Sequence, residues 1–288
     1  MSKKKEIFST KDKIWRAVIF CIMLFAALII LYPIFYIILG SFKENQELLM
    51  GGTRLLPKKF ILTNYADAWK QANFSRYTIN SLIISFGVMI LTLLVASSAG
   101  YIFSRAKFRF KELLYSLYIA FMFVNVGSVT LRPLFELAVK VNLNKSLLSV
   151  ILIAVGSGQA RNVFLCRGFV NSLPKELDEA ATIDGCTFFQ IYYKIILPLM
   201  KPILATIGLL SFRAGWNQYI VPLVFTMSRP AMRPLTVGVV MLKSTGDATA
   251  AWNIMFAGSA ISIVPIICIY IFANKYFLTG LTAGSVKG

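Results

Sequence analysis

Residues 171–202 read NSLPKELDEAATIDGCTFFQIYYKIILPLMKP, and this segment differs in composition from the rest of the chain. The whole sequence has twelve acidic residues against 30 Lys and Arg, and four of the twelve fall within nine positions here. These four are Glu176, Asp178, Glu179 and Asp184. Such a cluster in a chain of net charge +18 is either a solvated loop or a surface that offers carboxylates to the Arg or Lys of another protein.

Local rules predict two short helices in this segment. Pro174 suits a helix start, and the acidic residues after it suit the positive end of a helix dipole. Asp184 followed by Gly185 is typical of a turn, and we expect Gly185 to adopt a left-handed backbone conformation. Thr187 with Gln190 forms a capping-box pattern for the second helix, which we expect to end near Pro198.

The composition around this segment is that of a membrane protein. Of the 288 residues, 57% are hydrophobic and 15% are charged, and the mean hydropathy is +0.71. A strong positive charge in a soluble protein would indicate nucleic-acid binding, but basic residues at the ends of apolar segments are what membrane topology and anionic lipid select. We therefore expect contact with membrane lipid and none with nucleic acid.

Enzyme and metal chemistry are poorly supported. The chain has no histidine, and its four cysteines form no C-x-x-C pair. It also lacks the G-x-x-x-x-G-K-[ST] motif with which P-loop proteins bind ATP. We expect no catalytic residue, no metal and no cofactor bound by this chain.

The hydropathy pattern predicts an all-α integral membrane protein with six transmembrane helices. The first apolar run is too long for a signal peptide, so we expect it to remain as an anchor. Two of the six runs are less clean, because GSGQARN interrupts one and Arg213 with WNQY lies in another. The predicted spans are residues 17–39, 82–103, 113–131, 146–165, 202–225 and 254–274.

The distribution of Lys and Arg predicts that both termini are cytoplasmic. Basic residues crowd the first 16 positions and the short connection at 105–111, as the positive-inside rule requires. The connection at about 166–201 then also faces the cytoplasm. We expect residues 1–79 to form the cytoplasmic N-terminus, the first span and an external loop, and residues 80–288 to form a core of five spans.

The acidic segment resembles the EAA signature of ABC importer permeases. The signature residues, in their full spacing, are Glu179, Ala180, Ala181, Gly185, Ile195, Leu197 and Pro198. In that family the segment is a coupling helix that sits in a cleft of an ATPase subunit, where its Glu pairs with an Arg. The resemblance therefore implies that the ATPase-coupling residues are Glu176, Glu179, Ala180, Ala181, Asp184 and Gly185.

Further stretches are similar to the second of two dissimilar permeases in importers of the maltose and oligosaccharide type. They are LYPIFYIILGSFK at 31–43, NY at 64–65, NSL at 80–82, AGYIFSRAKF at 99–108, GWNQYIVPL at 215–223 and GLTAGSVKG at 280–288. The resemblance implies a type I importer fold in a bacterial cell membrane. It also implies a second permease, two cytoplasmic ATPase subunits that hold ATP and Mg, an external solute-binding protein and a sugar substrate. We expect the tail at 280–288 to be ordered against the ATPases.

Four residues are candidates for the substrate path. Arg213 lies eleven residues, or about 16 Å, beyond Pro202 and so close to the bilayer midplane. A charge there costs at least about 2.5–3.5 kcal/mol in lipid, so we expect Arg213 to face inward. Trp216, Asn217 and Tyr219 offer an aromatic face and polar groups that suit a sugar. The alternative is that Trp216 and Tyr219 only pack against other helices and that Arg213 snorkels or forms a structural ion pair.

Two other functions stay open at this stage. A permease for amino acids, peptides or metals would share the EAA segment, although the WN motif and the terminal GLTAGSVKG weigh against it. An ion channel or membrane enzyme is a poorer match, because histidine and paired intramembrane carboxylates are missing.

Overall fold

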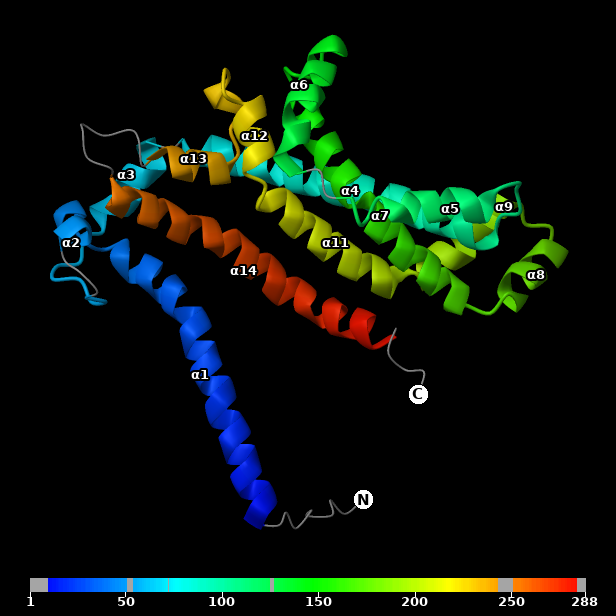
Figure 1. Cartoon of the computed structure of the whole chain (residues 1–288), viewed down its shortest axis with the longest axis horizontal. Coiled ribbons are helices and arrows are strands. Elements are labelled where there is room, and N and C mark those ends of the chain that lie inside the picture. The colour runs from blue at the N-terminus through cyan, green and yellow to red at the C-terminus, as the bar shows by residue number, and fades with distance from the viewer. Residues whose placement is uncertain (1–9, 51–53, 72, 125–126, 243–250, 284–288) are drawn as a thin grey trace. The chain divides into compact units, whose positions relative to one another are not determined.

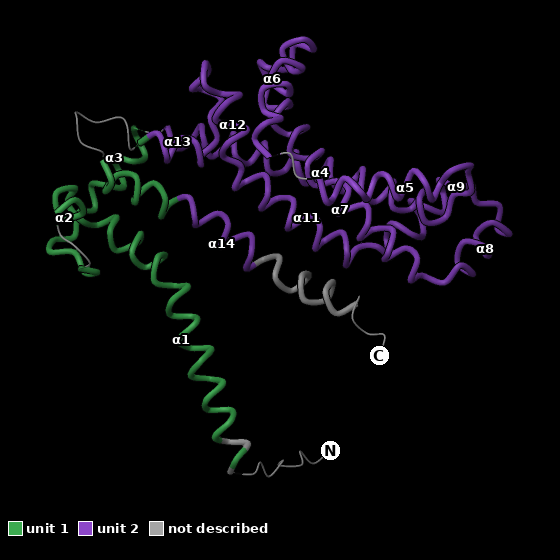
Figure 2. Tube along the Cα trace, in the orientation of Figure 1, with its two compact units in different colours: residues 1–71, 242–261 green, residues 72–241, 262–288 purple. Residues whose placement is uncertain are grey.

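The computed structural model describes residues 10–50, 54–71, 73–124, 127–242 and 251–283, and every regular element within these ranges is a helix (Figure 1). The chain divides into two compact units (Figure 2). Unit 1 is Met1–Gln71 with Leu242–Ile261, and unit 2 is Ala72–Met241 with Ser262–Gly288. The last helix, α14 (Trp252–Ala283), contributes to both units.

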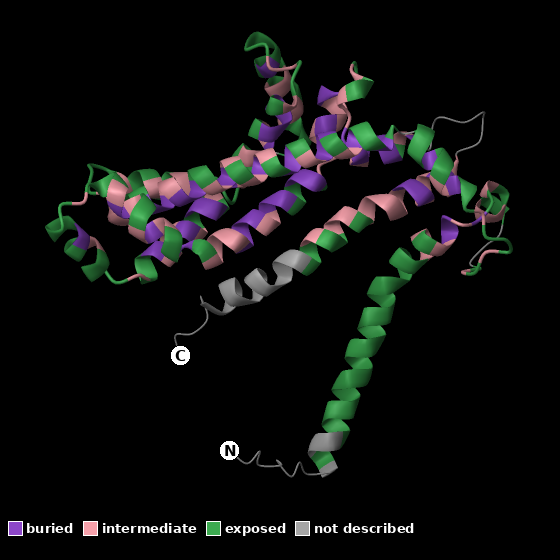
Figure 3. Ribbon diagram, turned by 180° about the vertical axis from the view of Figure 1, so that it is seen from behind, coloured by how far each residue is buried: buried purple, intermediate pink, exposed green. Residues whose placement is uncertain are grey.

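Unit 1 begins with one long helix, most of which is exposed. Helix α1 (Thr10–Gly40) exposes every described side chain from residue 14 to residue 35, although the helix is strongly apolar (Figure 3). An apolar surface of this extent is stable only in lipid or against another protein. The helix thus has the properties expected of the first membrane span.

Asn64 and Tyr65 hold the remaining parts of unit 1 together. Both lie in α3 (Thr63–Gln71), which follows α2 (Asn45–Met50). The buried Asn64 side-chain amide donates to the carbonyls of Ser41 and Lys43 at 2.8 and 2.9 Å, and its oxygen accepts from Asn253 of α14 at 2.9 Å. The Tyr65 hydroxyl lies 2.7 Å from Ser41 Oγ. The NY pair of the sequence therefore connects α3 by hydrogen bonds to the end of α1 and, through Asn64, to α14.

Three long helices form the core of unit 2. Helix α4 (Phe74–Arg105) packs against both α7 (Leu147–Ser172) and α11 (Lys201–Trp216). The described part of unit 2 also contains ten short helices: α5 (Lys111–Ala120), η1 (Gly127–Thr130), α6 (Leu131–Lys140), α8 (Glu176–Ile183), α9 (Phe188–Ile191), η2 (Tyr192–Ile196), α10 (Leu197–Leu199), α12 (Ile220–Phe225), η3 (Pro230–Met232) and α13 (Leu235–Met241).

Side chains of the NSL stretch in α4 form hydrogen bonds with the backbone of residues 231–235, which lead into α13. The Asn80 amide donates to the carbonyls of Ala231 and Arg233 at 2.9 and 3.0 Å, and Ser81 Oγ accepts from the Leu235 N–H at 2.8 Å. Asn80 and Ser81 are both buried, so these bonds satisfy backbone groups that water cannot reach.

Helices α4 and α7 meet at a point where only glycine fits. A Cβ atom on Gly100 would lie 2.5 Å from the Cβ of Cys166 and 2.9 Å from the backbone nitrogen of Arg167. Small residues allow this approach, which is how helices associate where lipid removes the hydrophobic drive between them.

Four helices in the described part of the chain are long and apolar enough to cross a membrane, or five if one bent pair is counted as a span. The four are Ile14–Gly40, Phe74–Arg105, Leu147–Ser172 and Trp252–Ile271. They confirm the first, second, fourth and last predicted spans as long apolar helices. The bent pair, Phe188–Leu199 with Lys201–Trp216, turns by 77°.

The third predicted span, residues 113–131, is wrong as a continuous helix. Helix α5 ends at Ala120, and ten residues are only about 15 Å long. Gly127 then has a φ of +60°, which a right-handed helix cannot accommodate, and a 3₁₀ turn follows. Hydropathy remained high across this backbone break, so the sequence pattern concealed it.

The fifth predicted span, residues 202–225, is also wrong as one helix. Helix α11 ends at Trp216 and α12 begins at Ile220. Pro222 has no N–H, so the carbonyl of Gln218 would have no partner in a continuous helix. That carbonyl instead accepts from Thr236 Oγ1 at 2.6 Å. The carbonyl that the break leaves without a helical partner is therefore hydrogen-bonded by a residue next to it in the fold but distant in the sequence.

The GSGQARN stretch lies within the fourth span, and two of its polar residues face other helices, as expected. Helix α7 continues through it, and Gln159 and Asn162 are both only 6% exposed. The Gln159 amide donates to the carbonyl of Thr92 on α4 at 3.3 Å. Polar residues within a span that cannot face lipid face another helix, and here they face the core of unit 2.

The contact at Gly100 leads to a direct prediction. Replacing Gly100 with Ala should destabilise the protein by about 1–3 kcal/mol, because the added methyl group has no room against the α7 backbone. Gly168→Ala is the matched control, since Gly168 is also helical and has open space at its Cβ position. Thermal unfolding in detergent should show a lower midpoint for Gly100→Ala only. Equal midpoints would show that the helices can separate without cost.

Candidate functional site

The acidic segment forms two short helices at one end of unit 2, close to where α4 ends (Figure 1). Gly185 between them has a φ of +79°, as predicted. The capping box is also confirmed: Thr187 Oγ1 accepts from the Gln190 N–H at 3.3 Å, and Gln190 Oε1 accepts from the Thr187 N–H at 2.8 Å. The chain continues through η2 and α10, which ends one residue after Pro198.

Helix α8 has one anchored face and one free face. Ala181 is 4% exposed and packs into a core cluster with residues of α4, α7 and α11. The other predicted coupling residues are exposed: Glu176, Glu179, Ala180, Asp184 and Gly185. Ala181 is thus buried against its own chain, and the other five form the surface that is available to another protein.

Large apolar side chains lie on the exposed surface of these two short helices. Ile183 is 87% exposed, Phe189 71% and Leu177 38%. Exposed apolar side chains among carboxylates are typical of a protein-binding surface, in which the apolar groups supply burial and the charges supply orientation.

Arg105 fixes α8 to the end of α4, and sequence reasoning missed it. Its Nε atom lies 3.0 Å from Oδ2 of Asp178, and these side chains are only 8% and 18% exposed. Its Nη2 atom donates to the carbonyl of Leu173 at 2.9 Å. The available signal was topological, because residues 105–111 and the acidic segment were predicted to lie on the same side of the membrane.

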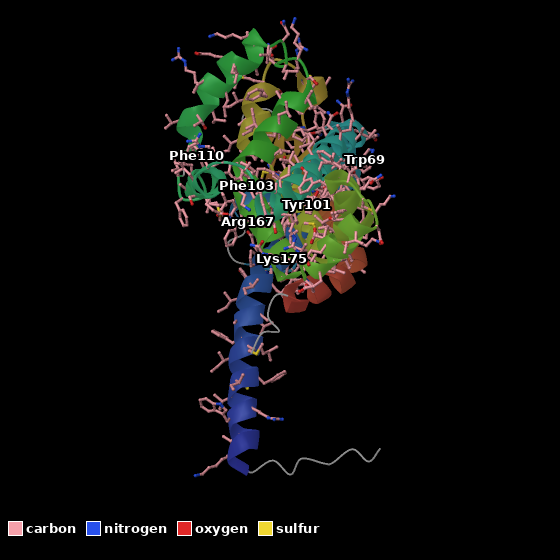
Figure 4. The ribbon with its side chains drawn as sticks, turned by 90° about the vertical axis from the view of Figure 1, so that its right-hand side faces the viewer. Trp69, Tyr101, Phe103, Phe110, Arg167 and Lys175 are labelled. Carbon is pink, nitrogen blue, oxygen red and sulfur yellow. The ribbon has the colours of Figure 1, made fainter. Side chains whose placement is uncertain are left out.

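A second ion pair ties α5 to α7 nearby. Arg167 Nη2 lies 2.8 Å from both carboxylate oxygens of Glu112, and the guanidinium stacks 3.8 Å from the ring centre of Tyr115. Figure 4 views this end of unit 2, with Tyr101, Arg167 and Lys175 labelled. The end of the core that carries α8 is therefore held by charged contacts as well as by packing.

The four predicted path residues lie on two different faces. Arg213 and Asn217 are exposed, and they are four residues apart, so they share a helix face. Trp216 is 2% exposed and stacks on Phe212 with ring centres 6.1 Å apart. Tyr219 is half-buried, in the break between α11 and α12. Trp216 is thus buried within this chain, and its role in the substrate path stays a prediction.

A groove of about 890 Å³ lies beside this break. It is largely apolar, with polar groups from Ser128, Thr130, Ser157 and Gln218. None of the four predicted path residues lines it, but Gln218 lies between two of them and Ser157 belongs to GSGQARN. Sequence reasoning missed Gln218, although the polar run WNQY indicated the position.

The described residues contain no group of three or more His, Cys, Asp or Glu that could hold a metal ion. The expectation that the chain binds no cofactor stays a prediction. The expected order of the tail at 280–288 also stays a prediction, because residues 284–288 lie outside the described ranges.

Comparison with known proteins finds a membrane-transport family and relatives that are named as transport permeases. Residues 93–277 match the family described as the binding-protein-dependent transport system inner membrane component. The arabinooligosaccharides transport system permease protein AraQ of Halalkalibacterium halodurans is 35% identical over 92% of this chain and 94% of its own length. The sulfoquinovosyl glycerol transport system permease protein SmoH of Agrobacterium fabrum is 30% identical over 90% of this chain and 89% of its own.

A solved structure shares the fold. A chain of a bacterial ABC transporter involved in the import of the acidic polysaccharide alginate superposes with a TM-score of 0.80 at 24% identity, covering 95% of this chain and 100% of that chain. The family match extends from α4 into α14 and includes both the acidic segment and the break after α11. The chain therefore belongs to the family of binding-protein-dependent transport system inner membrane components, and it is a transport permease rather than an enzyme.

Proposed function

We propose that this chain is a transmembrane subunit of an ATP-driven carbohydrate importer, in which it forms half of the translocation path. The observation that carries the proposal is the free acidic face of α8, held on the core by Ala181 and Arg105. Family membership implies a partner permease, an ATPase and a solute-binding protein. In this arrangement ATP and Mg are bound by two cytoplasmic ATPase subunits, and this chain receives their movement through α8.

The substrate class follows from the relatives. Their names specify arabinooligosaccharides, sulfoquinovosyl glycerol and diacetylchitobiose, and the solved structure belongs to an alginate importer. These are all carbohydrates or carbohydrate conjugates. The exposed Arg213 would suit a sugar that carries a carboxylate or phosphate, but family resemblance favours a neutral oligosaccharide.

The membrane arrangement that we propose has six crossings with both termini in the cytoplasm. Four apolar helices and the bent pair support five crossings, and α5 with the segment after it would form the remaining one as a broken helix. Broken helices are tolerated where they line a cavity, and the groove beside η1 and α12 meets that condition. Residues 1–79 would precede the permease core at 80–288, with the coupling loop at about 166–201.

Charge reversal at Glu179 tests the docking role of α8. Glu179→Lys should remove most of the ATPase that co-purifies with the permease, because like charges at a partly buried contact typically cost several kcal/mol. Glu136→Lys, on the exposed α6, is the control and should leave co-purification unchanged. Normal recovery of ATPase with the Glu179 variant would contradict the proposal.

Substitution at Gly185 tests the turn. Gly185→Val should lower transport, because a β-branched residue at this φ is strained by about 1–3 kcal/mol and α8 would be displaced. The Cβ position is open space, so the effect would come from the backbone alone. Gly185→Asn is the control, since Asn tolerates left-handed geometry. Equal uptake by the two variants in membrane vesicles would show that the turn conformation is unimportant.

Cysteine labelling tests the path. In a variant without the four native cysteines, a water-soluble thiol reagent should label Cys introduced at 213 and 217 but not at 216. Arg213 and Asn217 are exposed on one face, whereas Trp216 is buried. The assembled transporter must be used, so that lipid and partner contacts are present. Protection of both 213 and 217 in every nucleotide state would contradict the assignment.

A further inference from the structure

Three side chains along one face of α4 contact the segment that carries α8. Ser97, Tyr101 and Arg105 are spaced four residues apart, so they form one stripe on the helix. Arg105 contacts Asp178 of α8. The stripe therefore ends on the helix whose outer face is the proposed docking surface.

The two inner contacts of this stripe reach α9 and η2. The Tyr101 ring lies 4.6 Å from that of Phe188 and 5.3 Å from that of Tyr192, and its hydroxyl donates to the Phe188 carbonyl at 3.3 Å. Ser97 Oγ lies 2.7 Å from the Tyr192 hydroxyl. Both short helices of the acidic segment are thus attached to the same face of α4.

The outermost contact differs from the other two because it is ionic and enclosed. Asp178 Oδ1, Asp178 Oδ2 and Arg105 Nε are buried and make no hydrogen bond within the described residues, so the two charges depend on each other. Removing one partner would leave the other buried and unpaired, which proteins strongly disfavour. Helix α8 has only one buried residue, Ala181, so the ion pair is a main restraint on its rotation.

Helix α4 also reaches the break after α11. A Cβ on Gly215 would lie 2.8 Å from the Cα of Ser85, so the α4 backbone touches α11 next to Asn217. Packed helices shift as units and do not deform continuously. A displacement of Arg105 would therefore also displace the surroundings of Asn217.

We propose that Arg105 is a positioning residue, which through Asp178 transmits the movement of α8 to α4 and so to the substrate path. The inference rests on the proposed function, because it requires α8 to be the helix moved by the ATPase. It goes further by assigning the transmission to one enclosed ion pair.

The experiment uses the transporter purified with its partner permease and ATPase, and a cysteine introduced at Asn217. The probe is a water-soluble thiol reagent, added with and without a non-hydrolysable ATP analogue and Mg. With Asp178 intact, the nucleotide should change the labelling rate by about tenfold, a usual size for coupling between sites. With Asp178→Asn, the two rates should become equal in complexes that retain the ATPase. Glu112→Gln is the matched control, because it breaks the nearby Arg167 pair without touching α8.

The outcomes separate the inference from the proposed function. A full nucleotide effect in Asp178→Asn, or loss of the ATPase from this variant, would overturn the inference, because the pair would be dispensable or would only support docking. Restoration of the effect by Arg105→Asp combined with Asp178→Arg would support it even if the single variant accumulates poorly, and failure of a well-folded double variant would count against it. Absence of any nucleotide effect in the parent would overturn the proposed function, and the inference with it.

Discussion

The close packing of α4 against α7 and α11 is the contact on which the rest of unit 2 depends. Lipid provides no hydrophobic drive between helices, so their association relies on tight van der Waals contact. Gly100 of α4 allows that contact with α7, and Gly215 of α11 allows it with α4 at Ser85. Ser85 and Ser97 can lie in the same interface because their hydroxyls donate to carbonyls one turn earlier, at 2.7 and 2.6 Å. The interface can therefore contain small polar residues, because their hydroxyl groups are hydrogen-bonded within α4.

The same constraint determines where the polar residues lie. Gln159 and Asn162 would be expensive against lipid, and both are buried against the core. At the end of the core, where α4 leaves the packed region, the contacts become ionic: Arg105 with Asp178 and Arg167 with Glu112. Packing by small residues fixes the distance between helices, and the ion pairs fix the orientation of the short helices attached to them.

The sequence predicted those features that depend on neighbouring residues. The glycine turn at Gly185 and the capping box at Thr187 follow from rules that act over three or four positions, and both are present. Hydropathy failed at residues 113–131 and 202–225, because it sums transfer free energies and ignores backbone geometry. A left-handed Gly127 and the missing N–H of Pro222 change hydropathy very little, but neither is compatible with one continuous, fully hydrogen-bonded helix.

Features that depend on how one helix is rotated against another could not be predicted from the sequence. Trp216 and Asn217 are adjacent in the sequence, and only the contact of α11 with α4 determines that one is buried and the other exposed. The pair of Arg105 with Asp178 joins residues 73 positions apart, for which topology gives the membrane side but not the partner. Ser85 and Arg105 are 20 residues, or about 30 Å, apart on α4. Helix α4 contains no proline, unlike α1 and α14, so an uninterrupted helix connects Arg105, at the proposed coupling end, to Ser85, which contacts Gly215 of α11. This continuity is what the proposed mechanism requires, because a bend or break in α4 would absorb a rotation of α8 before it reached α11.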